Sequence, residues 1–140
     1  RSYIASKTSP IAYDQIDTAI EKIEASCDIL LIEGAGGILV PLDSENTMLD
    51  LVKRYDATLL LVTHCKLGCI NDTLVNLALL EQENIPHCWA VNCQEKDLKS
   101  YEEISLPYFK EKFSTVYHVD SQIESLAQAL LDTIPKVNQD

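Results

Sequence analysis

Apolar residues gather in short blocks along this chain, and segments of helical spacing separate the blocks. The blocks at 29–33, 57–63 and 87–91 are nearly continuous apolar runs, which are typical of strands buried on both faces of a parallel sheet. A weaker block at 114–119 indicates one more strand. The sequence therefore predicts four strands.

Between the blocks, apolar residues recur at the three- and four-residue spacing of an amphipathic helix. The predicted helices span 11–26, 47–55, 70–83, 101–113 and 121–134. Pro107 is expected to break the fourth helix, and Ser121 with Glu124 is expected to form a capping box at the start of the fifth. The charged segment 94–100 is expected to be a surface loop.

The alternation of helices and strands predicts an α/β fold. The strands should form a parallel sheet with helices on both faces, a three-layer arrangement in which each crossover is right-handed. A chain of 140 residues has the length of one domain, so we expect residues 1–140 to belong to a single α/β domain.

The four glycines of the chain follow the first two apolar blocks: Gly34, Gly36, Gly37 and Gly68. Glycine lets the backbone take positive φ angles and lets a ligand approach closely. In open α/β sheets, ligands bind beyond the carboxyl ends of the strands, so these two loops are the expected site. Glu33, directly before the first loop, is then a candidate metal ligand; the alternative is a solvated acid at a strand end.

Charge and cysteine content exclude several classes of protein. The chain has 22 acidic and 11 basic residues, and the basic ones are scattered, which argues against nucleic acid or an anionic membrane as a partner. No apolar run approaches the ~20 residues of a membrane span. Five cysteines, an odd number, and a polar start without an export signal predict reduced thiols in a cytoplasmic protein.

Some residues near the predicted strand ends could belong to a metal site or a catalytic site. Four thiols would suit zinc, but their spacing places them at strand ends and not in a tight turn, so small buried side chains are favoured. These thiols are Cys65, Cys69, Cys88 and Cys93. His64 and Lys66 lie close to the second glycine loop, but no partner carboxylate is suggested by the spacing. We therefore expect packed or solvated side chains there.

Two segments carry a resemblance to a known family. EGAGGILVPL at 33–42 and KLGCIN at 66–71 resemble the two signature segments of dethiobiotin synthetase, a P-loop NTPase-class enzyme of biotin synthesis, and Asn92 ends the next predicted strand. The resemblance covers about 8–92. It implies ATP-dependent ring closure: diaminononanoate takes up carbon dioxide as a carbamate, the carbamate attacks ATP, and the resulting anhydride closes to dethiobiotin.

The resemblance also implies roles for residues on the nucleotide side. Glu33 matches the acid that binds Mg²⁺, and Asn92 matches the residue that reads the nucleotide base. The loop along the ATP phosphates matches Gly34, Ala35, Gly36 and Gly37. An amide side chain offers both a donor and an acceptor, which suits the edge of a base.

On the substrate side, the second signature segment matches the start of a helix that, in this family, binds the carboxylate tail of the diamine. In this family that helix start belongs to the neighbouring subunit of a homodimer. The residues concerned are Gly68, Cys69, Ile70 and Asn71. Unpaired amides and the helix dipole favour an anion there, the alternative being an ordinary hydrated helix start. Ser9 matches a substrate contact, and Tyr108 matches either a second contact or a plain core aromatic.

The sequence departs from the family in two places. The motif G-x-x-x-x-G-K-[ST] does not occur, so no catalytic residue is expected in this segment. We expect 1–140 to be the C-terminal part of a longer protein and to be inactive alone. If the native chain starts at Arg1, the strand at 29–33 lacks a sheet neighbour and exposes an apolar face. The family's Gly-x-x-Pro segment is absent from 116–120, which leaves the base preference open.

Two other functions remain open from the sequence. A non-catalytic module could keep the sheet and the dimer surface and act by binding or regulation alone. A partitioning-type P-loop ATPase would need a face for nucleic acid or a membrane, and the scattered basic residues speak against such a face.

Overall fold

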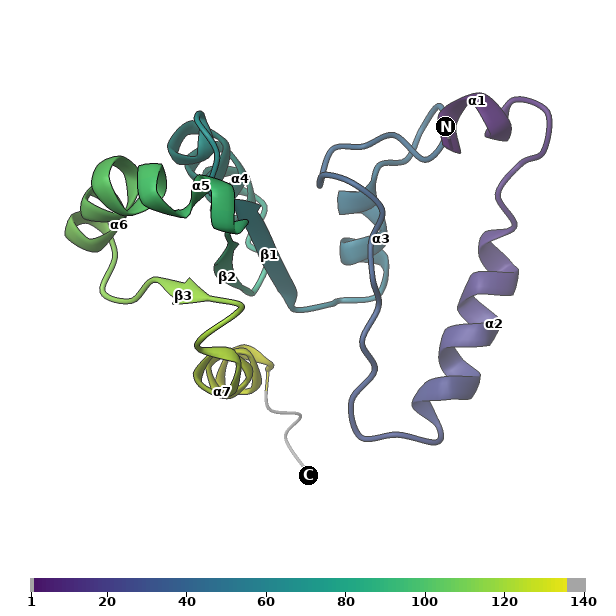
Figure 1. Cartoon of the computed structure of the whole chain (residues 1–140). Coiled ribbons are helices and arrows are strands. Elements are labelled where there is room, and N and C mark those ends of the chain that lie inside the picture. Colours follow the sequence, from purple (N-terminus) through teal and green to yellow (C-terminus); the bar gives the residue numbers. More distant parts are fainter. Residues whose placement is uncertain (1, 136–140) are drawn as a thin grey trace. The chain divides into compact units, whose positions relative to one another are not determined.

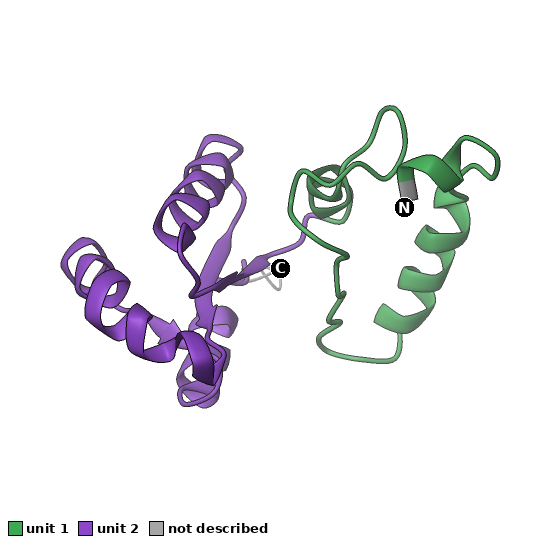
Figure 2. Cartoon of the chain, turned by 45° about the horizontal axis from the view of Figure 1, so that its top comes forward, with its two compact units in different colours: residues 1–55 green, residues 56–140 purple. Residues whose placement is uncertain are grey.

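The computed structural model describes residues 2–135. They form two compact units, the first ending at Tyr55 and the second beginning at Asp56 (Figure 2). In chain order (Figure 1) the elements are α1 (Ser2–Ser6), α2 (Tyr13–Glu24), α3 (Met48–Arg54), β1 (Leu59–His64), α4 (Cys69–Gln82), β2 (His87–Asn92), α5 (Glu95–Ser100), the π-helix η1 (Tyr101–Ser105), α6 (Leu106–Lys112), β3 (Tyr117–His118) and α7 (Ile123–Thr133). Among the described residues, none of these helices is both long and apolar enough to cross a membrane.

The second unit contains a parallel sheet in the order β1-β2-β3. The register between β1 and β2 begins at Leu59 opposite His87 and ends at His64 opposite Asn92. Because the strands run parallel and in register, both reach the same edge of the sheet at their carboxyl ends. The predicted α/β fold with a parallel sheet is confirmed.

Helices cover both faces of β2, the central strand. The thiol of Cys88 lies 3.0 Å from the hydroxyl of Thr133 on α7, whereas the ring of Trp89 lies 5.2 Å from the ring of Phe109 on α6. Successive side chains of a strand point to opposite faces, so α6 and α7 lie on opposite sides of the sheet. The predicted three-layer arrangement is therefore confirmed at β2.

An aromatic cluster fills the layer between β2 and α6. Phe109 is 0% exposed, and ring centroids lie 5.2 Å away for Trp89, 6.3 Å for Tyr101 and 6.2 Å for Phe113. Tilted and edge-on pairs of this kind stabilise a core beyond the area they bury. The cluster anchors β2, and with it Asn92 at the end of that strand.

A short network of polar groups adjoins the aromatic cluster. The Tyr101 hydroxyl lies 3.1 Å from Nε2 of His118, whose Nδ1 lies 3.2 Å from the side-chain oxygen of Gln122. An amide oxygen only accepts, so Nδ1 carries the proton and Nε2 accepts from the tyrosine. Burial raises the pKa of Tyr101 to about 12, and the neighbouring Cys69 adds to the shift.

Side-chain hydrogen bonds tie the parts of the first unit together. The Tyr13 hydroxyl donates to Asp43 over 2.5 Å, and Arg54 on α3 forms a bidentate pair with Asp17 on α2. The hydrogen bond from Tyr13 is the main reason that the pKa of Asp43 falls to about 2. Burial first, and then Asp43, raise the pKa of Tyr13 to about 12. These contacts connect α2 to the loop before α3 and to α3 itself.

The predicted strand at 29–33 is absent from the structure, which contradicts the sequence-based expectation. The segment runs as irregular chain, and three of its four apolar side chains are exposed, reaching 80% for Leu31, whereas Leu30 is half-buried. A strand requires a neighbour for its backbone groups, and no described segment pairs with this one. The exposed apolar face is the outcome that we expected for this block without a sheet neighbour.

Other boundaries differ in smaller ways. The expected loop at 94–100 contains helix α5, and Pro107 lies in the first turn of α6, where the absence of its N–H costs no hydrogen bond. Helix α7 begins after Gln122, and no side chain caps it, so the capping box expected from Ser121 is wrong. A capping box is present in α3, where Thr47 and Asp50 exchange hydrogen bonds.

Candidate functional site

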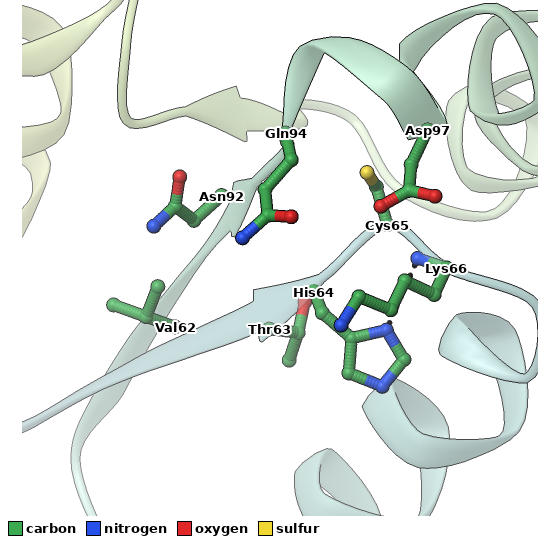
Figure 3. A pocket seen from close by; sticks show the side chains of 8 residues that line it. All are labelled: Val62, Thr63, His64, Cys65, Lys66, Asn92, Gln94 and Asp97. Carbon is green, nitrogen blue, oxygen red and sulfur yellow. Dashed lines mark hydrogen bonds between the residues drawn. The ribbon is translucent and has the colours of Figure 1, made fainter.

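A pocket of about 240 Å³ lies where β1 and β2 end. Figure 3 shows that its lining side chains come from two segments. One is the end of β1 with the loop after it, and the other is the end of β2 with the start of α5. The lining residues are Val62, Thr63, His64, Cys65, Lys66, Asn92, Gln94 and Asp97. Whole ligand sites usually measure ~300–1,000 Å³, so this pocket suits one part of a ligand, such as a nucleotide base.

Polar groups from the β2 side give the pocket its hydrogen-bonding character. Asn92, as predicted, stands at the last position of β2, and its amide lines the pocket together with the amide of Gln94. Within the described residues, oxygen Oδ2 of Asp97 is buried without a hydrogen-bond partner. A buried acceptor without a partner is costly unless water or a ligand supplies a donor. The pocket therefore offers donors and acceptors to a polar ligand.

His64, on the β1 side, has a carboxylate partner, which corrects the expectation drawn from spacing. Its Nε2 lies 3.1 Å from Oδ2 of Asp72 in the first turn of α4, and its Nδ1 accepts the backbone N–H of Lys66 over 3.1 Å. Because Nδ1 accepts, the proton sits on Nε2 and is donated to Asp72. His64 thus positions the loop between β1 and α4, which includes Lys66.

A disulfide joins the two sides of the pocket. Cys65 and Cys93 are bonded, with their Cα atoms 5.1 Å apart, so the expectation of reduced thiols is wrong for this pair. It holds for Cys27, Cys69 and Cys88, which are free. Within residues 2–135, no group of three or more metal-ligating side chains gathers, and two of the four thiols considered for zinc are consumed by the bond.

The segment predicted to bind the substrate tail forms the start of α4. Gly68 takes a φ of +96°, a conformation that side chains disfavour, and its missing side chain leaves the helix without a side-chain cap. The N–H groups of Ile70 and Asn71 donate to no acceptor within the described residues. Cys69 is buried, and its thiol donates to Ser105 over 3.4 Å, so its side chain supports the turn.

Glu33 and the first glycine loop lie in the first unit. Glu33 is exposed and forms no hydrogen bond or ion pair with the described residues. Gly36 has a φ of +84°, and an added Cβ would stand 3.0 Å from Val40, so glycine is required there. After a turn at 37–40, backbone bonds from Met48 to Val40 and from Leu49 to Ile38 fix the loop against α3.

The remaining predicted contacts, Ser9 and Tyr108, fall in different units. Ser9 is exposed just after α1, and its backbone N–H donates to Ala5 over 2.9 Å. Tyr108 is 39% exposed on α6, and its ring centroid lies 6.1 Å from that of Phe109. It therefore covers the aromatic core with one side and leaves the other open.

Comparison with known proteins shows the family to which this chain belongs. The family model described as "AAA domain" matches residues 2–128. The chain belongs to this family. Its resemblance to dethiobiotin synthetase, and the P-loop NTPase-like fold class that the resemblance implied, are confirmed by the comparison and by the parallel sheet.

Curated relatives carry the same name. The chain is 40% identical over 121 residues to "ATP-dependent dethiobiotin synthetase BioD" of Wolinella succinogenes, which covers 86% of this chain and 56% of the relative. It is 36% identical over 128 residues to the protein of that name from Sulfurovum sp., covering 91% and 60%. A third, from Helicobacter pylori, is 33% identical over 104 residues, covering 74% and 47%. The chain spans about half the length of the curated relatives it matches.

Sequence reasoning missed several lining residues that follow the strand ends. Gln94 and Asp97 lay in a segment expected to be a surface loop, although their position just after β2 places them at the ligand-binding edge of a parallel sheet. Cys65 and Cys93 each come one residue after a strand end, and only the register of β1 against β2 shows that they meet.

Proposed function

We propose that this chain supplies binding parts of an ATP-dependent dethiobiotin synthetase. The observation that carries the proposal is the place of Asn92, whose amide ends β2 and lines a pocket at the carboxyl edge of the parallel sheet. Membership of the AAA domain family and the names of the relatives support it. ATP is then a substrate, together with diaminononanoate and carbon dioxide.

The reaction joins two amines through one carbon atom. One amine of diaminononanoate bonds to carbon dioxide and loses a proton, which gives a carbamate. A carbamate oxygen then bonds to the γ-phosphorus of ATP, and ADP leaves. The second amine attacks the carbon of this carbamic-phosphoric anhydride, phosphate leaves, and the five-membered ring closes to dethiobiotin. Such transfers depend mainly on positioning and on neutralising phosphate charge.

The resemblance assigns the nucleotide contacts to two segments, one in each unit. Asn92 contacts the base, and the loop that continues from Glu33 runs along the phosphates with backbone at Gly34, Ala35, Gly36 and Gly37. An exposed carboxylate without a protein partner fits Mg²⁺, which usually takes one or two carboxylates and completes its shell with phosphate and water oxygens. Bound there through Glu33, Mg²⁺ would neutralise phosphate charge.

The substrate side of the proposed site is the start of α4. The N–H groups of Ile70 and Asn71, which lack acceptors in the described structure, would receive the carboxylate tail, since a helix start favours an anion. Gly68 and Cys69 would shape this turn, and Ser9 and Tyr108 would contribute further contacts. We also propose that the protein acts as a homodimer in the cytoplasm, with this turn completing the partner's site.

We propose further that residues 1–140 are the C-terminal part of a longer α/β domain. The sequence lacks G-x-x-x-x-G-K-[ST], the loop that cradles ATP phosphates and neutralises them with lysine, and the chain spans 56% and 60% of two relatives. The phosphate loop and the catalytic lysines would then lie upstream, and this segment alone would be inactive.

The test is an assay of the whole protein that carries this chain, with diaminononanoate-dependent release of phosphate as the readout. Glu33→Gln should abolish Mg²⁺-dependent turnover, whereas the matched control Glu24→Gln, on an exposed acid of α2, should not. Asn71→Leu should weaken diamine binding more than ATP binding. Full turnover in Glu33→Gln would exclude the metal role, and equal losses of both affinities would exclude the tail-binding role.

A second candidate is a non-catalytic binding module, favoured by the missing phosphate-loop motif. Such a module would bind nucleotide or diamine without releasing phosphate in any context. Phosphate release by the whole protein decides against it, whereas binding without turnover decides for it.

A further inference from the structure

The disulfide between Cys65 and Cys93 links the ends of β1 and β2, where the pairing of the strands already holds the two residues close together. His64 and Asn92 are the last register partners of β1 and β2, and each cysteine follows one of them. Neighbouring strands lie ~4.8 Å apart, and disulfides need Cα atoms ~4.4–6.8 Å apart. The observed 5.1 Å therefore follows from strand pairing, so two thiols or one disulfide can occupy the same sheet.

The bond also lies where a small molecule can reach it. Cys65 is 3% exposed and lines the pocket, and Cys93 is partly exposed beside it. Attack by an external thiol therefore occurs most easily from the Cys93 side. The other two cysteines of the second unit have different neighbours: the Cys69 thiol donates to Ser105, and the Cys88 thiol lies against Thr133.

We propose that Cys65 and Cys93 are a reversible redox pair that sets the rigidity of the pocket. The oxidant is a small-molecule disulfide, RSSR. The Cys93 thiolate attacks one of its sulfurs and releases RS⁻, which takes up the proton that Cys93 lost. The Cys65 thiolate then attacks the Cys93 sulfur of the mixed disulfide and releases the second RSH. One disulfide is consumed and one is formed, and an excess of RSH reverses both steps.

Oxidation ties together the two walls that flank the pocket. One wall follows β1 and the other follows β2, and beyond the strand ends the bond is a direct covalent link between them. When the bond is reduced, the walls are free to separate, and a ligand must order them as it binds. Ligands bind more tightly to a pocket that is already ordered, so the oxidised form is the tighter binder.

The first test counts thiols in the whole protein that carries this chain. Equilibration in mixtures of reduced and oxidised glutathione, followed by maleimide labelling and peptide mass spectrometry, should show Cys65 and Cys93 losing label together. The matched control Cys27→Ser removes an exposed free cysteine of the first unit and should leave that transition unchanged. If both thiols still label fully at the most oxidising ratio, the proposal is wrong.

The second test measures hydrogen exchange in the two redox forms. Amides of 63–66 and 92–97 should exchange about tenfold or more slowly in the oxidised form, because the cross-link suppresses local opening. Amides of α2 in the first unit serve as the internal reference. Cys93→Ser should show the fast rates under both conditions, and reduced wild type gives the same comparison if that variant does not fold. Identical rates in both forms overturn the proposal.

A third measurement rests on the proposed function, because it uses ATP as the probe of the pocket. In the whole protein that carries this chain, the oxidised form should bind ATP several-fold more tightly than the reduced form. ATP binding of equal strength in both forms contradicts the redox proposal. No ATP binding in either form contradicts the nucleotide role of Asn92, and the thiol count and the exchange rates then decide the redox proposal by themselves.

Discussion

Truncation of Phe109 to alanine is expected to be the most damaging single change in the second unit. The ring is 0% exposed and stands within 5.2–6.3 Å, centroid to centroid, of Trp89, Tyr101, Tyr108 and Phe113. Removal of a fully buried phenylalanine costs ~3–5 kcal/mol, through lost burial and the cavity that remains. Because Phe109 has four ring neighbours, we expect its truncation to cost an amount in the upper part of this range.

Phe113 provides a matched control. It is the same residue type and touches the same tryptophan, at 5.0 Å, but it is only partly buried. Because the cost scales with the apolar area removed from water, Phe113→Ala should lose roughly half as much free energy of unfolding as Phe109→Ala. The two variants thus separate burial from aromatic contact with Trp89.

Urea unfolding followed by fluorescence measures both costs, since Trp89 is the one tryptophan of the sequence and lies within the cluster. With a slope of ~2 kcal/mol per molar urea, a loss of ~4 kcal/mol lowers the midpoint by ~2 M. Circular dichroism should give the same midpoint. Equal losses in the two variants, or a loss below ~1 kcal/mol for Phe109→Ala, would refute the assignment of Phe109 as the centre of the core.

Two further predictions concern titration. The pKa of Asp43 is about 2, below the ~3.9 of an unfolded aspartate, so the stabilisation it brings is present above pH ~4 and is lost as the pH falls towards 2. Carboxyl NMR shifts of Asp43 should report this late titration, and Tyr13→Phe should move it upwards; an unchanged value would contradict the role of Tyr13. The pKa of Tyr101 is about 12, so the stabilisation it brings is present below pH ~10 and falls as the pH rises towards 12. Tyr101→Phe should shrink the late, high-pH phase of tyrosinate absorbance, to which Tyr13 also contributes; a late phase of unchanged size would show that Tyr101 is not a shielded phenol.

The second unit was largely predictable because its elements find their partners within it. The blocks at 57–63 and 87–91 pair with one another as β1 and β2, and the helical spacing at 70–83 gives α4. Local pattern and tertiary pairing agree here, which is when sequence patterns are most reliable. Asn92 could be placed at a strand end for the same reason.

The first unit shows the limit of this reasoning. The block at 29–33 has a strand's composition, but a strand exists only when another segment satisfies its backbone, and none of the described segments does. Composition therefore predicted the hydrophobicity of this segment and not its structure. The pairing of Cys65 with Cys93 was likewise hidden, because it depends on register between strands 28 residues apart in sequence.

The π-helix η1 has a consequence for how this protein can vary. It lies between α5 and α6 without a break, so it acts as one extra residue inserted into a continuous helical run. Loss of one residue among the exposed positions 102–104 would convert the run to plain α-helix. Because the wide turn absorbs the extra residue, the residues after it would keep their orientation, and Phe109 would still face Trp89. A one-residue deletion should therefore be tolerated better at 102–104 than in α5 or α6, where it would turn the following residues by ~100°.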